Sequence, residues 1–195
     1  IATKYSLRDR AGDLNFAGNH RKNMMRSVHE SLRRLNTEFI DVLWVHAWDS
    51  WTPTEEIMKG LEDLVSRGMV HYIGVSDTPA WVVSQANTMA QLRGWSQFVG
   101  LQIEYSLIQR SVEPELMQMA RAFGMTVTPW APLAGGALTG KYLRGEQGRI
   151  TPQSARLGER AVSITKKVVE VAERLGVSPA QVAINWTRQH KGQSI

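Results

Sequence analysis

Short apolar runs alternate with longer amphipathic stretches along most of the chain. The run 41–46 reads DVLWVH and is almost wholly apolar, which is typical of a strand buried on both faces. The stretch 53–66 carries Ile57, Leu61 and Leu64 at helical spacing. The whole pattern predicts five strands, at 1–5, 41–46, 71–76, 98–105 and 126–130, and helices at 23–35, 53–66, 80–92, 115–123, 165–175 and from Pro179 to about His190.

Helix boundaries carry their own signals. Thr52 to Glu55 and Ser178 to Gln181 both have the spacing of a capping box, and Gly68 is placed to end the second helix. The stretch 131–158 is rich in Gly, Pro and Arg and predicts a long loop. Loops of this length inside a compact domain usually have a function or move.

Strands that alternate with helices favour βαβ units and a parallel sheet. The βα spacing of roughly 30 residues suits a (β/α)8 TIM barrel, which needs eight strands to close. We therefore expect residues 1–195 to form a single barrel domain that is incomplete at both ends and lacks the N-terminal strands and the last strand. An open doubly wound sheet is the alternative, but no G-x-G-x-x-G follows any strand.

Composition changes this picture in two ways. The 195 residues include no Cys, which excludes disulfides, thiolate metal sites and a Cys nucleophile. The net charge of +5 permits anionic partners. Because most Lys and Arg residues are spread along the chain, a solvated basic surface is favoured over nucleic-acid binding. No signal peptide or membrane-spanning run is visible, so we expect a cytoplasmic protein with neither membrane nor nucleic acid as partner.

Polar and aromatic residues stand where the strands end, which is the edge that carries the site in barrels of this kind. Each also has an ordinary structural explanation: a strand-end Lys reaching solvent, a hydrogen-bonded His, a helix-capping Ser or Asp, a core Trp. His46 and Asp49 alone do not make a metal site, because no second His lies nearby. The candidates are Lys4, His46, Asp49, Ser76, Asp77, Gln102 and Trp130, with Trp48, Trp51 and Trp81 beside them as a tentative aromatic substrate pocket.

The glycine-rich segment after Trp130 has backbone N–H groups and ends in Lys141, a combination that suits a phosphate. It lacks the spacing of a P-loop, and a flexible loop explains it equally well.

The order of these segments along the chain is more specific than any one of them. Taken in sequence, Thr3-Lys4, the stretch DVLWVHAWD at 41–49, GMVHYIGVSD at 68–77, QIEYSL at 102–107 and WAPLAGGALTGKY at 130–142 resemble the aldo-keto reductase superfamily. The resemblance covers essentially the whole chain. It is greatest to the branch that contains bacterial aldo-keto reductases and the β subunits of potassium channels.

This resemblance implies an NADPH-dependent enzyme that reduces aldehydes and ketones to alcohols by hydride transfer. Lys4 and His46 match two members of the family's four-residue site. The family's Asp and Tyr fall before the position of Ile1, and the segment for the adenosine 2′-phosphate falls after Ile195. Tyr5 cannot replace the missing Tyr, because its side chain points to the other side of the strand.

The resemblance also implies the cofactor contacts. Ser76, Asp77 and Gln102 match residues that hold the nicotinamide carboxamide, and Trp130 matches the ring that stacks on the nicotinamide. Asp77 departs from the Asn or Arg common there, and Ala131 departs from a common Ser. The loop over the pyrophosphate corresponds to Pro132, Leu133, Leu138, Gly140 and Lys141.

Three functions remain open from the sequence. The first is a reductase acting on a small carbonyl substrate. The second is a catalytically weak NADPH-binding regulatory subunit of a partner protein, and the third is a nucleic-acid-binding protein. The presence of both Lys4 and His46 favours the first.

Overall fold

The computed structural model describes residues 1–8 and 10–189. They form two compact units, one made of residues 1–102 and 115–126, the other of residues 103–114 and the chain from 127 onward. The prediction of one barrel domain over residues 1–195 stays a prediction.

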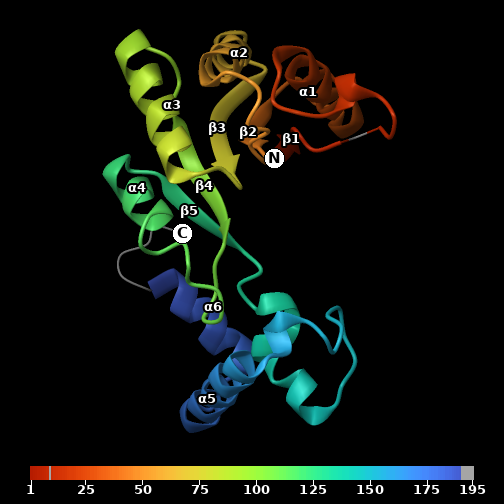
Figure 1. Cartoon of the computed structure of the whole chain (residues 1–195), viewed down its shortest axis with the longest axis vertical. Helices are drawn as coiled ribbons and strands as arrows, with labels where there is room; N and C mark the ends of the chain where they lie inside the picture. Colours follow the sequence, from red (N-terminus) through yellow and green to blue (C-terminus); the bar gives the residue numbers. More distant parts are fainter. Residues whose placement is uncertain (9, 190–195) are drawn as a thin grey trace. The chain divides into compact units, whose positions relative to one another are not determined.

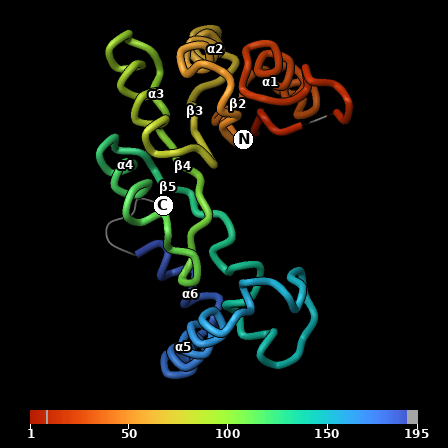
Figure 2. Tube along the Cα trace, in the orientation of Figure 1, coloured from red at the N-terminus to blue at the C-terminus, as the bar shows by residue number. Residues whose placement is uncertain are grey.

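The first unit is built from strands and helices that alternate along the chain (Figures 1 and 2). A short 3-10 turn at Leu14–Phe16 precedes the first helix, and the last strand of this unit, β4, continues into the second. The elements are β1 (Ala2–Tyr5), α1 (Arg21–Leu35), β2 (Ile40–Val45), α2 (Thr54–Ser66), β3 (Val70–Ser76), α3 (Ala80–Arg93), β4 (Phe98–Glu104) and α4 (Leu116–Ala122).

The strands form one sheet in the order β1-β2-β3-β4-β5, where β5 is Thr126–Trp130. The β1–β2, β2–β3 and β3–β4 pairs are all parallel. A doubly wound sheet reverses its strand order at a switch point, whereas consecutive barrel strands keep the order of the chain. The prediction of an α/β fold of the (β/α)8 type is therefore confirmed, and the doubly wound alternative is wrong.

One face of this sheet is a packed apolar layer. Leu43, Ile73 and Leu101 are each at most 1% exposed. The apolar stripe of α2, which includes Leu61 and Leu64, is fully buried as well. The helical spacing seen in the sequence thus marks the buried side of α2.

The opposite face holds a row of four residues in register across four strands: Lys4, Trp44, Gly74 and Gly100. The indole of Trp44 packs against both glycines. A Cβ added at Gly74 would stand 2.5 Å from the ring, and one at Gly100 would stand 2.8 Å from it. Only glycine leaves room for this ring on the two neighbouring strands.

The second unit carries 3-10 turns and two helices. The turns are η2 (Ala134–Thr139), η3 (Lys141–Arg144) and η4 (Ala155–Leu157), and the helices are α5 (Glu159–Leu175) and α6 (Pro179–Gln189). Leu138, Val168 and Ala183 form the centre of its apolar core. The stretch expected as a plain loop thus contains three 3-10 turns, and α5 starts at Glu159 rather than Thr165.

The capping boxes have opposite outcomes. Ser178 and Gln181 bind each other's backbone N–H at 2.8 and 3.2 Å, which confirms the second box. At Thr52 the expected box is wrong, because its hydroxyl donates instead to Asp49 at 2.7 Å. His190, the expected end of the last helix, lies outside the described residues.

None of the helices within residues 1–8 and 10–189 has the length and apolar character needed to cross a membrane. The expected cytoplasmic location stays a prediction.

The contact of Trp44 with the glycines yields a stability prediction. Gly74→Ala forces the indole to move or the strand to shift, so we expect unfolding to become easier by about 1–3 kcal/mol. Urea denaturation of the native protein measures this.

Gly60→Ala, within α2, is the matched control, because the atoms nearest to its new Cβ are the flexible end of the Met24 side chain on α1. There we expect a change within about 1 kcal/mol, since Ala also favours the helix. Equal losses in the two variants would contradict the role given to Trp44.

Candidate active site

Lys4 is the centre of the polar group on the first unit. Its ammonium donates a hydrogen bond to Oε1 of Gln102 and lies 5.7 Å from the ring centroid of Trp44. Lys4 is on β1 and Gln102 on β4, about 14 Å apart on a flat sheet with ordinary strand spacing. The two side chains meet because the sheet curves towards this face, as the wall of a barrel does.

His46 follows β2 directly and faces the same space. Its backbone N–H donates to the carbonyl of Tyr5 at 3.0 Å, which fixes the end of β2 beside the end of β1. Lys4 and His46 both line a cavity of about 300 Å³. Two cations and one anion share its wall, namely Arg8, Arg34 and Glu30. The sequence therefore identified two residues that the fold brings into one cavity.

The pKa values of both basic residues in this cavity lie below their ordinary values. Burial lowers the pKa of Lys4, and the carboxylate of Asp77 partly offsets that effect. Burial also lowers the pKa of His46, the ammonium of Lys4 lowers it further, and Asp77 again acts in the opposite direction. His46 is consequently neutral near pH 7 and has both an N–H donor and an acceptor nitrogen.

Ser76 and Asp77 stand at the end of β3 but in different environments. Ser76 is 1% exposed and pairs in register with Gln102, whereas Asp77 is exposed. Asp77 has a φ of 40°, and its carbonyl accepts from the backbone N–H of Trp48 at 3.3 Å. The loops after β2 and β3 are therefore joined through the backbone.

Positive φ values recur where the strands end. Ser6 follows β1, Asp77 follows β3 and Ala131 follows β5, with φ values of 105°, 40° and 53°. Such conformations are costly for residues with a side chain. In the described residues the carboxyl edge is thus a place of backbone strain, as functional edges often are.

In the second unit, Trp130 ends β5 with 37% of its surface exposed. Its carbonyl accepts from the N–H of Tyr105 at 3.3 Å. Pro132 and Leu133 are half-buried, and Leu138 is fully buried in the apolar core. Trp130 therefore has an exposed ring surface, whereas Leu138 has its side chain committed to packing.

Lys141 has its side chain folded back onto the glycine-rich turn. Its Nζ lies 5.0 Å from the centroid of the Tyr142 ring, and a Cβ at Gly136 would stand 3.1 Å from its Cε. Gly140 precedes it with a φ of 78°, which favours glycine. The cation is half-buried and close to backbone, as an anion-binding turn requires.

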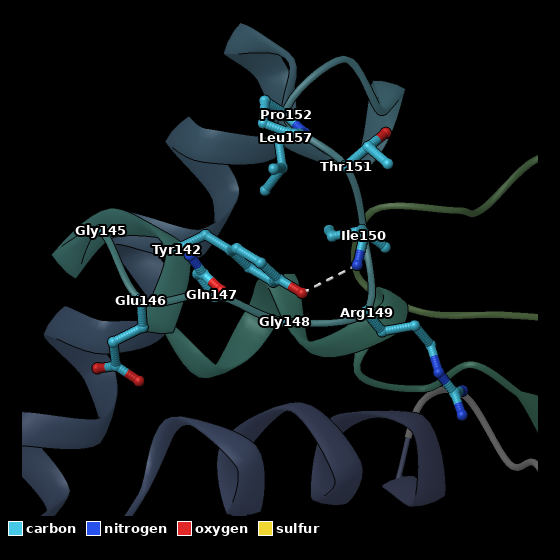
Figure 3. A pocket seen from close by; sticks show the side chains of 10 residues that line it. All are labelled: Tyr142, Gly145, Glu146, Gln147, Gly148, Arg149, Ile150, Thr151, Pro152 and Leu157. Carbon is cyan, nitrogen blue, oxygen red and sulfur yellow. Dashed lines mark hydrogen bonds between the residues drawn. The ribbon is translucent and has the colours of Figure 1, made fainter.

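A cavity of about 540 Å³ lies beside this turn (Figure 3). Tyr142 organises it: its hydroxyl accepts from the N–H of Ile150 at 3.2 Å and donates to the carbonyl of Gly135 at 3.4 Å. The rest of the wall comes mainly from residues 145–152. No motif in the sequence indicated this cavity, since its walls are largely the backbone of an irregular segment.

A comparison with protein families identifies the family of this chain. The model of the aldo/keto reductase family matches residues 1–195. The chain belongs to the aldo/keto reductase family. The resemblance drawn from the sequence is therefore confirmed.

Individual relatives agree with this assignment. A putative aryl-alcohol dehydrogenase of Saccharomyces cerevisiae is 38% identical, over 96% of this chain and 70% of its own length. The aryl-alcohol dehydrogenase (NADP+) of Phanerodontia chrysosporium is 38% identical over 97% of this chain and 54% of its own. An aldo-keto reductase of Aspergillus calidoustus is 38% identical over 94% and 48%. The chain thus spans between about half and 70% of the length of these relatives.

The hydroxyl of Tyr5 is committed to a structural hydrogen bond. Tyr5 is 4% exposed, and its hydroxyl donates to the carbonyl of Asn19 at 3.3 Å. Burial raises the pKa of Tyr5, and the carboxylates of Asp49 and Glu56 raise it further. Tyr5 lines the cavity of Lys4 and His46, but its hydroxyl is buried and bound to the Asn19 carbonyl, so it does not serve as the proton donor beside Lys4.

The tryptophans considered for substrate binding lie in different places. Trp48 packs edge-on against Trp81, with ring centroids 5.5 Å apart, and lines a small apolar cavity with Ile57 and Val82. Trp51 is 88% exposed. Trp48 is thus packed in an apolar contact, and the substrate role of Trp48 and Trp51 stays a prediction.

Asp49 has a full set of hydrogen-bond donors around it. Its carboxylate accepts from the backbone N–H of Asn19, Trp51 and Thr52 and from the Thr52 hydroxyl, at 2.7–2.9 Å. In the described part of the chain no three His, Cys, Asp or Glu side chains gather as a metal site would need.

The sequence analysis did not identify Trp44 as a residue that shapes the candidate site. It was counted as one apolar residue of a buried strand. The available signal was the pair of glycines at positions 74 and 100, each in the middle of a predicted strand.

The cavity electrostatics predict opposite shifts for two variants. Asp77→Asn removes the charge that favours protonation, so the pKa of His46 should fall. Lys4→Met removes a repelling cation, so the same pKa should rise. A titration of the His46 ring by NMR in the native protein measures both.

Asp41→Asn serves as the control, because Asp41 stands at the opposite end of β2. It should leave the His46 titration unchanged. Shifts of the same sign in the two site variants would contradict the electrostatic assignment.

Proposed function

We propose that the protein containing this chain reduces aldehydes or ketones to alcohols with NADPH. The observation that carries this proposal is that Lys4 and His46 stand at the ends of neighbouring strands and line one cavity beside the edge strand β1. Family membership and relatives named as aryl-alcohol dehydrogenases support it.

The donor set of the chain suits a nicotinamide dinucleotide. On the first unit, the Ser76 hydroxyl and the Gln102 amide supply a donor and acceptor pair for a carboxamide. On the second, the exposed ring of Trp130 suits an aromatic heterocycle. The glycine-rich turn with Lys141 suits a pyrophosphate. When bound, NADPH supplies the hydride.

Asp77 and the remaining loop residues have narrower roles. The Asp77 carboxylate is an acceptor only, so it would receive a hydrogen bond from a carboxamide N–H₂ and give none. Leu138 would act by holding the turn on the core. Pro132, Leu133 and Gly140 would shape the backbone around the pyrophosphate.

The chemistry of this chain's own residues follows from their charges. The Lys4 ammonium stabilises negative charge and so favours the ionised form of a neighbouring proton donor. A neutral His46 donates an N–H to the carbonyl oxygen of a substrate, which polarises the bond and fixes its direction. Partial burial of both residues strengthens these interactions, because little water competes.

Lys4→Met tests this assignment in the native protein. We expect kcat for carbonyl reduction to fall by about 10²–10⁴-fold, as on loss of proton-transfer catalysis, while NADPH affinity changes little. Steady-state kinetics and a fluorescence titration with NADPH measure the two effects.

Lys22→Met is the control, since Lys22 is exposed and binds Asn15 on the surface. Turnover retained within a few-fold in Lys4→Met would remove Lys4 from the mechanism. Tight NADPH binding with negligible turnover in the unmodified protein would instead favour the regulatory-subunit alternative.

Aromatic carbonyl compounds are the substrate class we propose, because the relatives' names and the tryptophans of the loop after β2 point the same way. Trp48→Ala should raise KM for aromatic aldehydes by about 3- to 10-fold relative to aliphatic aldehydes, the value of one aromatic contact.

Trp95→Ala provides the comparison, because Trp95 precedes β4 and so lies at the amino-terminal ends of the strands, away from the candidate site. An unchanged preference in Trp48→Ala across a series of aldehydes would exclude Trp48 from the substrate pocket.

A further inference from the structure

Asn19, between β1 and α1, uses all of its polar groups on a neighbouring loop and strand. It is 0% exposed. Its side-chain N–H₂ donates to the carbonyl of Ala47 at 2.8 Å, and its side-chain oxygen accepts from the N–H of Asp49 at 2.7 Å. The amide therefore binds the loop after β2 as a neighbouring strand would.

Asp49 also binds Asn19 through its side chain. Its carboxylate accepts from the backbone N–H of Asn19 at 2.7 Å, so the two residues hold each other through two hydrogen bonds. Burial by itself would raise the pKa of Asp49, but hydrogen bonds from Asn19, Thr52 and Trp51 lower it overall. The carboxylate is therefore ionised and strongly bound at neutral pH.

Ser6, directly after β1, binds the same loop after β2. Its hydroxyl binds both the carbonyl and the N–H of Ala47 at 3.0 Å, and its own carbonyl accepts from the N–H of Gly18 at 2.7 Å. Tyr5, in turn, donates to the carbonyl of Asn19. The hydrogen bonds therefore end on the residues that directly follow Lys4 and His46.

We propose that Asn19 and Asp49 are positioning residues that set where Lys4 stands relative to His46. The inference rests on the proposed function, because it assigns these residues a purpose in that reaction. A turn that only had to close would need fewer bonds. Here the bonds of Ser6 join the end of β1 to the loop after β2, and the bonds of Asn19 join that loop to the segment before α1, so a displacement of the loop is transmitted to both functional side chains.

Asn87 provides a matched control at the amino-terminal ends of the strands. Asn87 is also 0% exposed, and its amide binds the backbone in the same reciprocal way, donating to the carbonyl of Phe98 at 3.2 Å and accepting from its N–H at 2.8 Å. Phe98 begins β4, whereas Lys4 and His46 stand where strands end. A purely structural role would make the two asparagines equivalent.

The experiment compares Asn19→Asp with Asn87→Asp in the native protein. Each change keeps the size of the side chain and removes the same donated bond. We expect both to lower the melting temperature. For Asn19→Asp we expect kcat to fall about 10- to 100-fold with KM within a few-fold, since small misplacements of reacting groups have effects of this size. For Asn87→Asp kcat should stay within about 2-fold.

Ser6→Ala is the second variant, in case Asn19→Asp fails to fold. It removes the hydroxyl that holds Ala47 and adds no charge, so kcat should fall in the same direction by a smaller factor. Equal kcat in the site variants and in Asn87→Asp would overturn the proposal.

An NMR measurement on the same variants distinguishes failure of the positioning proposal from failure of the proposed function. The ring signals of His46 should shift in Asn19→Asp and Ser6→Ala but not in Asn87→Asp, whether or not the protein reduces carbonyl compounds. Unmoved His46 signals would overturn the positioning role. An inactive parent protein with shifted signals would instead overturn the proposed function and leave the structural coupling in place.

Discussion

The contact of Trp44 with two glycines is the constraint on which the polar face of the sheet depends. The indole needs two neighbouring strands without side chains at the same level, and Gly74 and Gly100 provide them. The ring then forms a floor beneath the Lys4 ammonium, which crosses it to reach Gln102. Without the glycines the ring would be lifted and this path blocked. A packing requirement in the middle of the sheet thus decides how a charged group at its edge can be placed.

The same arrangement explains why a lysine is acceptable here. A cation this close to the interior loses hydration, which costs free energy unless other groups replace the water. Gln102 accepts one hydrogen bond, the Trp44 ring offers its negative face, and Asp77 supplies a compensating charge at longer range. None of the three neutralises the lysine by a direct ion pair. Lys4 therefore stays available to act on a bound molecule.

Much of this organisation could be predicted from the sequence, because it depends on local patterns. The five strands, their parallel order and the placing of Lys4 and His46 follow from alternating elements and from strand ends. The Thr52 box failed because Asp49, three residues away in sequence, bound the hydroxyl that a helix cap would have used. Trp44 was missed because its role depends on register across three strands, which no single segment encodes. Asn19 was missed for the same reason: its partners Ala47 and Asp49 are distant in sequence.

The positive φ values of Ser6, Asp77 and Ala131 have a consequence for attempts to make this protein more robust. Glycine would relieve the conformational cost at each position, and a screen for thermostability would select such changes readily. They would also loosen the carboxyl edge, where precise placement matters more than rigidity elsewhere. Selection for heat resistance and selection for catalytic efficiency would therefore act in opposite directions at these three sites. The carboxyl edge is better stabilised by substitutions in the apolar layer between the sheet and the helices.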